Sequence, residues 1–195
     1  LKDEAEKISI SRQKAAKKFE DVLLKNAVSL GLKNLRFNVS MTQGKLTPEG
    51  KDNVDFLCAF NRNQPLMPVA HTASGGEMAR LTLCIKAITA NKLKLPTVIF
   101  DEIDTGVSGD IADRMGSMMA DIAEGMQVFA ITHLPQVAVK GKSHLLVYKH
   151  DEGDRTVSNV RVLGEDERVR EIARMLSGKV INEAALSNAR ELLKG

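Results

Sequence analysis

The sequence contains Thr97-Val98-Ile99-Phe100-Asp101-Glu102, an apolar run that ends in two adjacent carboxylates. Short apolar runs of this kind are typical of strands buried in a parallel sheet. Open α/β sheets bind ligands just beyond the carboxyl ends of such strands. Asp101 could hold Mg²⁺ there, because this ion prefers one or two carboxylates with phosphate oxygens, and Glu102 could polarise an attacking water. Many strands end in acids, so this stretch alone is a weak sign of catalysis.

A predicted helix begins 27 residues before Asp101 (101 minus 74), at Ser74-Gly75-Gly76-Glu77. Ser74 and Glu77 form a capping box, which explains these two residues without any function. The two glycines are not explained in this way, because each costs about 1 kcal/mol relative to alanine in a helix. A ligand that approaches the backbone closely would explain them. A phosphate would meet free N–H groups and the positive end of the helix dipole there.

His133 comes 32 residues after Asp101 (133 minus 101) and directly follows the predicted strand 127–132. A histidine at a strand end is usually incidental. If the two strands are neighbours in a parallel sheet, however, His133 reaches the same edge as Asp101 and Glu102. It could then hydrogen-bond a phosphate group or the attacking water.

In this order, the three patterns resemble the signature motif, the Walker B motif and the H-loop of ABC ATPases. Asp104 stands where the D-loop aspartate belongs. The resemblance implies a P-loop NTPase head of the ABC type, an α/β fold with a mostly parallel sheet and flanking helices. Ala73 departs from the general ABC pattern, in which leucine usually opens the signature motif.

Several stretches resemble the RecN family of SMC-like DNA repair proteins, in which Ala73 is no exception. They are ASGGEMAR (73–80), FDEIDTGVSG (100–109), VFAITHLPQVA (128–138), EIARMLSG (171–178) and ARELL (189–193). The resemblance implies a cytoplasmic, nucleoid-associated ATPase that acts in DNA double-strand break repair and recombination. It implies that two heads dimerise with ATP and Mg²⁺, and that DNA and a recombinase are partners.

The resemblance also implies a role for each candidate residue. Asp101 would position Mg²⁺, Glu102 would act as the base on water, and His133 would contact the γ-phosphate of ATP in the same head. The signature residues 74–77 would cap ATP held by the partner head, and Asp104 would couple the two sites across the dimer.

The order of apolar patterns predicts an α/β protein with a late antiparallel hairpin. Strands are expected at 35–41, 54–60, 97–100, 127–132, 143–150 and 156–163. Helices are expected at 1–28, 75–91 and 108–124, followed by one that ends near Gly178 and one that starts at Asn182.

Residues 1–28 form an amphipathic helix with a heptad seam that includes Leu1, Ile8, Ala15 and Val22. It is either a surface helix packed on its own domain or the returning end of a coiled-coil arm; the family resemblance favours the arm. The expected organisation is therefore the arm at 1–28 and the C-terminal lobe of the head at 29–195. Since the sequence begins inside this helical pattern, we expect it to be a fragment of a longer protein.

A phosphate loop of the form G-x-x-x-x-G-K-[ST] is missing from the sequence. Gly141-Lys142-Ser143 resembles its end, but Gln136 occupies the first glycine position. Leu176-Ser177-Gly178-Lys179 resembles a signature motif but lacks the second glycine. We therefore expect the Walker A lobe to lie elsewhere in the polypeptide, and the chain by itself to be inactive and to bind ATP weakly or not at all.

Two alternatives remain. A fragment of another ABC ATPase, such as a transporter, is disfavoured because no proline follows Glu102 and because a heptad helix precedes the head. A non-catalytic DNA-binding or clamp module of ABC-like shape is disfavoured because Asp101, Glu102 and His133 are all present.

Composition adds few constraints. The 28 basic and 25 acidic residues give a net charge of +3, which is too balanced to indicate nucleic-acid binding. A loose basic group, Lys140, Lys142, Lys149 and Arg155, is the one candidate for DNA contacts, although such groups are usually solvated surface. The two cysteines match no metal-ligand spacing, and no apolar run is long enough for a membrane span.

Overall fold

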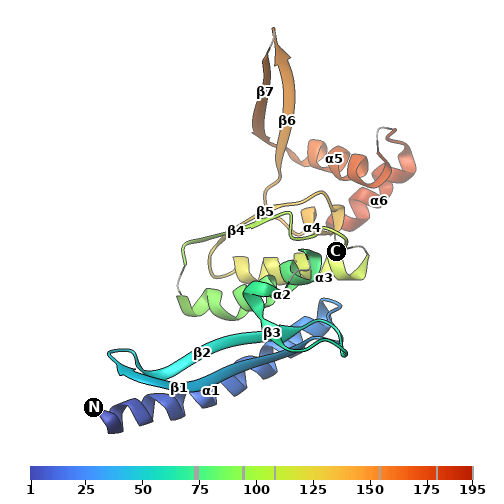
Figure 1. Cartoon of the computed structure of the whole chain (residues 1–195). Coiled ribbons are helices and arrows are strands. Elements are labelled where there is room, and N and C mark those ends of the chain that lie inside the picture. Colours follow the sequence, from blue (N-terminus) through green and yellow to red (C-terminus); the bar gives the residue numbers. More distant parts are fainter. Residues whose placement is uncertain (73–74, 94, 108, 154, 179, 195) are drawn as a thin grey trace. The chain divides into compact units, whose positions relative to one another are not determined.

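The computed structural model describes residues 1–72, 75–93, 95–107, 109–153, 155–178 and 180–194. The chain divides into two compact units, Leu1–Leu95 and Pro96–Gly195 (Figure 1). Within the described ranges no helix has the length and apolar character needed to cross a bilayer.

In the first unit a long helix lies along an antiparallel sheet of order β1-β2-β3. Its elements are α1 (Lys2–Ser29), β1 (Arg36–Thr47), β2 (Gly50–Ala59), β3 (Met67–Pro68), the 3-10 helix η1 (Val69–His71) and α2 (Gly75–Leu93). The predicted helices and the predicted pair of strands are confirmed, and the strands are longer than expected. Phe37 lies opposite Cys58 in the register, and both side chains are buried.

One face of α1 packs on its own unit. Ala5, Leu23 and Ala27 are buried, and Phe19 forms a ring cluster with two aromatic residues of the hairpin. The heptad residue Val22 is 39% exposed. The surface-helix interpretation therefore holds for one face of α1, while its use in a coiled coil stays a prediction.

The second unit confirms the α/β expectation. Its elements are β4 (Thr97–Asp101), α3 (Asp110–Ala123), β5 (Gln127–Ile131), α4 (Pro135–Ala138), β6 (Leu145–Glu152), β7 (Arg155–Val162), α5 (Glu165–Ser177) and α6 (Glu183–Lys194). Among the described residues the parallel pairing consists of β4 with β5, and the remaining strand pairs are antiparallel. The predicted late hairpin is β6–β7.

The expectation that the parallel strands are buried is only half correct. Val98 and Phe100 of β4 are buried, whereas Phe129 and Ile131 of β5 are 40% and 54% exposed. In the part of the chain that the structure describes, this sheet has two strands, and α3 packs against β5. A sheet covered on one side leaves alternate side chains exposed. Helix α3 buries Met115, Met119 and Ile122.

Candidate functional site

The parallel pairing brings the predicted catalytic residues of the second unit to one sheet edge. Asp101, the last residue of β4, lies opposite Ile131, the last residue of β5. The backbone N–H of Glu102 donates to the carbonyl of Ile131 at 3.1 Å, which extends the pairing by one step. His133 follows two residues later. The predicted juxtaposition of Asp101, Glu102 and His133 at this edge is thus a feature of the structure.

Asp104 is the buried centre of this edge. Its side chain is 2% exposed, and its carboxylate accepts a hydrogen bond from the hydroxyl of Thr132. The same hydroxyl oxygen accepts a bond from the N–H of Leu134 at 3.0 Å. Nδ1 of His133 lies 3.6 Å from Oδ1 of Asp104, while the imidazole itself is 65% exposed. Asp104 therefore connects the turn after β4 to the turn after β5, and its Oδ1 faces one side of the imidazole without a hydrogen bond.

Glu102 has an unusual backbone. Its φ is +45°, and it is the one non-glycine residue with positive φ in the described part of the chain. Such a conformation is uncommon for a side chain of this type and costs on the order of 1 to 2 kcal/mol. The hydroxyl of Thr105 donates to the carbonyl of Glu102 at 3.0 Å, which helps to hold the turn. The exposed Glu102 side chain is thus presented from a constrained position directly after the strand.

The edge can contribute to a metal site but does not form one by itself. Among the described residues no group of three or more His, Cys, Asp or Glu is arranged to hold a metal ion. Mg²⁺ needs only one or two carboxylates when phosphate oxygens and waters complete its shell. The exposed carboxylate of Asp101 fits such a shared site, in which the nucleotide supplies the other ligands.

The predicted signature residues belong to the first unit. Helix α2 begins at Gly75, and Ser74 lies outside the described residues, so the predicted capping box with Glu77 is untested. A Cβ added at Gly75 would meet open space, which means that no described neighbour requires a glycine there. Gly75 and Gly76 form the first turn of α2. The exposed start of this helix is therefore open to close approach from outside the chain.

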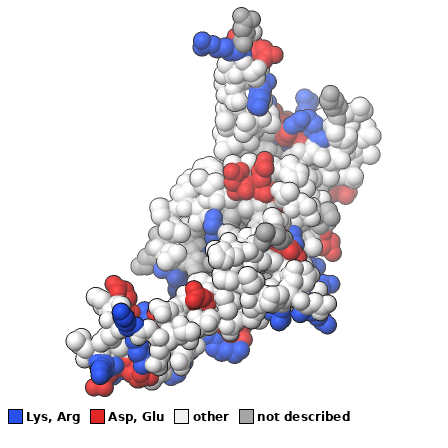
Figure 2. All heavy atoms as spheres, in the orientation of Figure 1, with Lys and Arg blue, Asp and Glu red and all other residues white. Residues whose placement is uncertain are grey.

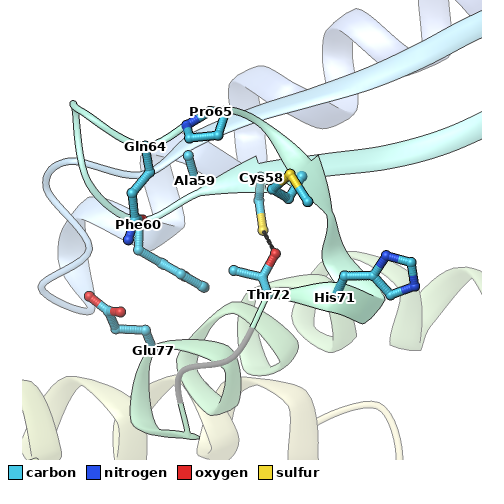
Figure 3. A pocket seen from close by; sticks show the side chains of 9 residues that line it. Cys58, Ala59, Phe60, Gln64, Pro65, His71, Thr72 and Glu77 are labelled. Carbon is cyan, nitrogen blue, oxygen red and sulfur yellow. Dashed lines mark hydrogen bonds between the residues drawn. The ribbon is translucent and has the colours of Figure 1, made fainter.

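Glu77 is half-buried and lines a pocket of about 380 Å³ beside this helix start. Phe60, just after β2, and Glu77 face the same opening in Figure 3. The thiol of Cys58 donates to the hydroxyl of Thr72 at 3.5 Å, and that hydroxyl donates to the carbonyl of Pro68 at 3.1 Å. These contacts hold Thr72, the last described residue before α2.

Sequence reasoning missed Thr132, which closes the buried contact with Asp104. The sequence did contain one indication of this contact, because Thr132 is a hydroxyl residue directly before His133 at the end of the predicted strand 127–132. The loose basic group of the second unit is less free than expected, because Lys140 pairs with Asp113 at 3.0 Å and its side chain is 24% exposed.

Comparison with known proteins shows what the chain is similar to. No protein-family model matches the chain. The chain is 39% identical over 191 residues to the DNA repair protein RecN of Vibrio cholerae, and 35% identical over 207 residues to that of Bacillus subtilis. These alignments include 97% and 98% of this chain but 34% and 36% of the relatives. The chain therefore spans about a third of the length of the curated relatives that it matches.

Solved structures with a similar fold are SMC heads. An Smc head domain with a coiled coil and joint from Pyrococcus yayanosii has a TM-score of 0.65 at 16% identity, and the match covers 90% of this chain and 32% of that one. A second match has a TM-score of 0.54 at 16% identity and covers 89% of this chain and 99% of the other. It comes from a study of ATP-driven dimerization and DNA-stimulated activation of SMC ATPases. The predicted fold class is confirmed.

Proposed function

From the relationship of this chain to the RecN DNA repair proteins, we propose that it forms the C-terminal lobe of an SMC-like ATPase head. The observation that carries the proposal is the sheet edge that brings Asp101, Glu102 and His133 together around the buried Asp104. A polar edge at the carboxyl ends of parallel strands is where nucleotide-binding α/β folds bind ligands.

Within one head, Asp101 would supply a carboxylate to Mg²⁺, which when bound would offset negative charge on the phosphates. Glu102 accepts the proton of the attacking water, and its constrained backbone sets the direction in which its side chain leaves the turn. His133 donates to the γ-phosphate from the imidazole nitrogen that Asp104 does not face. In this scheme Asp104 acts on His133 as a positioning residue.

Between heads, Ser74, Gly75, Gly76 and Glu77 cap the ATP of the partner head. The open space around Gly75 at the start of α2 supports this role, because the N-terminus of a helix is a ready site for phosphate. The D-loop role of Asp104, coupling the two sites across the dimer, belongs to the same proposal.

The missing phosphate loop belongs to a second lobe of the same polypeptide. The exposed apolar side chains of β5, Phe129 and Ile131, offer a surface that a further layer of structure would cover. The relatives are about three times as long as this chain, which leaves ample length for such a lobe. We further propose that the complete protein binds DNA, cooperates with a recombinase in double-strand break repair, and acts in the cytoplasm on the nucleoid.

The test is the hydrolysis rate of the complete polypeptide carrying Glu102→Gln. We expect the turnover number to fall by about 100-fold or more and an ATP-bound dimer to accumulate, because binding stays while the proton acceptor is lost. Glu124→Gln is the matched control, since Glu124 is an exposed acid at the end of α3. Normal hydrolysis by Glu102→Gln would overturn the assignment of the base. Tight ATP binding by the 195-residue chain alone, measured by calorimetry, would overturn the division between lobes.

A further inference from the structure

Charge is distributed unevenly between the two units. Of the 28 basic and 25 acidic residues, 16 basic and 9 acidic lie in Leu1–Leu95, which gives that unit a net charge of +7. The remaining 12 basic and 16 acidic residues give Pro96–Gly195 a net charge of −4. The small sum of +3 therefore conceals a basic unit. A polyanionic partner would be attracted to the first unit and repelled by the second.

Four of the 16 basic residues of the first unit lie on one line along α1. Lys7, Lys14, Lys18 and Lys25 are separated by seven, four and seven residues. At about 100° per residue, these spacings keep all four within a sector of about 40°. We call this set the lysine stripe. Lysine and arginine side chains also line the edge of the first unit in Figure 2.

The lysine stripe lies on the face of α1 that points away from the rest of its own unit. The buried residues Ala5, Ser9, Leu23 and Ala27 are placed about 160° to 200° around the helix from Lys7. Packing of α1 on its own hairpin therefore leaves the whole stripe in solvent, and its lysines are all exposed.

Three members of the stripe have their charge available. Lys7 pairs with Glu4 at 2.8 Å. Asp21, which flanks the stripe, pairs with Lys17 at 3.5 Å rather than with a stripe residue. Within the described residues Lys14, Lys18 and Lys25 have no ion-pair partner. Unpaired ammonium groups in a row on a rigid helix are a favourable contact for a row of phosphates.

We propose that Lys14, Lys18 and Lys25 form a contact surface for the phosphate backbone of duplex DNA. Eleven residues of helix separate the outer two, a length of about 16 Å, which corresponds to about five base-pair steps at 3.4 Å each. The one aromatic residue of α1, Phe19, faces the hairpin, so the stripe has no ring on which an unpaired base could stack. Contact is thus with the backbone and independent of base sequence.

The inference rests on the proposed DNA-repair function for the identity of the polyanion, but not on ATP hydrolysis. The chain has two candidate basic surfaces for DNA, the lysine stripe and the loose basic group of the second unit, and the observations favour the stripe. The group predicted from sequence in the second unit lies in a unit of net charge −4, and its Lys140 is already paired with Asp113. The lysine stripe has neither disadvantage.

The experiment measures binding of the 195-residue chain to a fluorescent 30-base-pair duplex by anisotropy, between 50 and 200 mM salt. The test variant carries Lys14→Gln, Lys18→Gln and Lys25→Gln. The matched control removes the same number of charges from the second unit, with Lys142→Gln, Lys149→Gln and Arg155→Gln. A third variant changes the three stripe residues to arginine, which keeps their charge. Circular dichroism checks that α1 is retained in each.

We expect the stripe variant to bind at least about tenfold more weakly at 100 mM salt, and its slope of log K against log salt to be shallower by about 2 to 3. The control and the arginine variant should bind like the unchanged chain. The proposal is overturned if the unchanged chain does not bind the duplex, or if the control loses as much affinity as the stripe variant. Tighter binding to a single strand of equal length, or equal binding to phosphatidylserine vesicles, also overturns it. Normal ATP hydrolysis by Glu102→Gln would count against the proposed function and would leave this result unaffected.

Discussion

Replacing Thr132 with valine tests whether the buried contact with Asp104 holds the candidate site together. Valine has nearly the shape of threonine but cannot hydrogen-bond. The change removes the hydroxyl that donates to the Asp104 carboxylate and accepts from the N–H of Leu134. It leaves the carboxylate in place, 2% exposed and without this donor.

The expected loss of stability follows from these two bonds. A hydrogen bond to a charged group contributes about 1.5 to 3 kcal/mol, and one between neutral groups about 1 kcal/mol. The sum is about 2.5 to 4 kcal/mol of unfolding free energy. With a typical urea slope of about 2 kcal/mol per molar, the unfolding midpoint of the second unit should fall by about 1 to 2 M.

Urea unfolding can be followed through Tyr148, the one tyrosine of the sequence, which lies in β6 of the same unit. Thr105→Val is the control, because Thr105 is exposed and donates a single bond to the carbonyl of Glu102. Its cost should stay below about 1 kcal/mol. Equal midpoints for Thr132→Val and Thr105→Val would refute the view that Asp104 is a buried carboxylate held by its neighbour.

Three further predictions concern the rest of the chain. A hydrogen bond from Ser9 is the main cause that lowers the pKa of Asp52 below its usual value of 3.8. The ionised Asp52 therefore stabilises the fold above about pH 4, and this stabilisation is lost as the pH falls through the lowered pKa of the folded state. Asp52→Asn should accordingly make the urea midpoint depend less on pH at the acid end of a pH series. Burial raises the pKa of Cys84 to about 12, so iodoacetamide at pH 8.5 should modify it about a thousandfold more slowly than in urea, and peptide mass spectrometry showing rapid labelling would contradict this. A Cβ at Gly116 would lie 3.1 Å from a backbone oxygen of α4, so Gly116→Ala should lower the unfolding free energy by about 1 to 3 kcal/mol. A Cβ at Gly75 would meet open space, so Gly75→Ala should instead raise it by up to about 1 kcal/mol in the same titration.

The position of Asp101 and His133 at the same sheet edge could be predicted from sequence, because it requires only that two apolar runs form neighbouring parallel strands. Both residues follow apolar runs, and parallel strands present their carboxyl ends at one edge. The positive φ of Glu102 and the bond between Thr132 and Asp104 could not be predicted, since both depend on the path of the turn after β4. Local periodicity carries no information about such a path.

Exposure of β5 could not be predicted for a different reason. Its sequence is apolar on both faces, as in a strand that is covered on both sides. Whether Phe129 and Ile131 are covered depends on which other segments of the polypeptide are present. The apolar pattern of β5 reflects the burial of the strand in the complete protein, not in this chain alone. The difference between pattern and structure at β5 is therefore consistent with the proposal that a second lobe packs there.

Net charge shows the same dependence on context. Averaged over 195 residues, a net charge of +3 is too balanced to indicate a nucleic-acid partner, and it leaves only short basic clusters such as the one near Lys142 to consider. Divided at Leu95, the same residues give +7 and −4, and the loose cluster falls in the acidic unit. Electrostatic attraction acts over about 8 to 10 Å at physiological salt, so a phosphate near α1 interacts with the charges of that unit and not with the chain average. The spacing of Lys14, Lys18 and Lys25 was visible in the sequence, but only the buried face of α1 determines that they point into solvent.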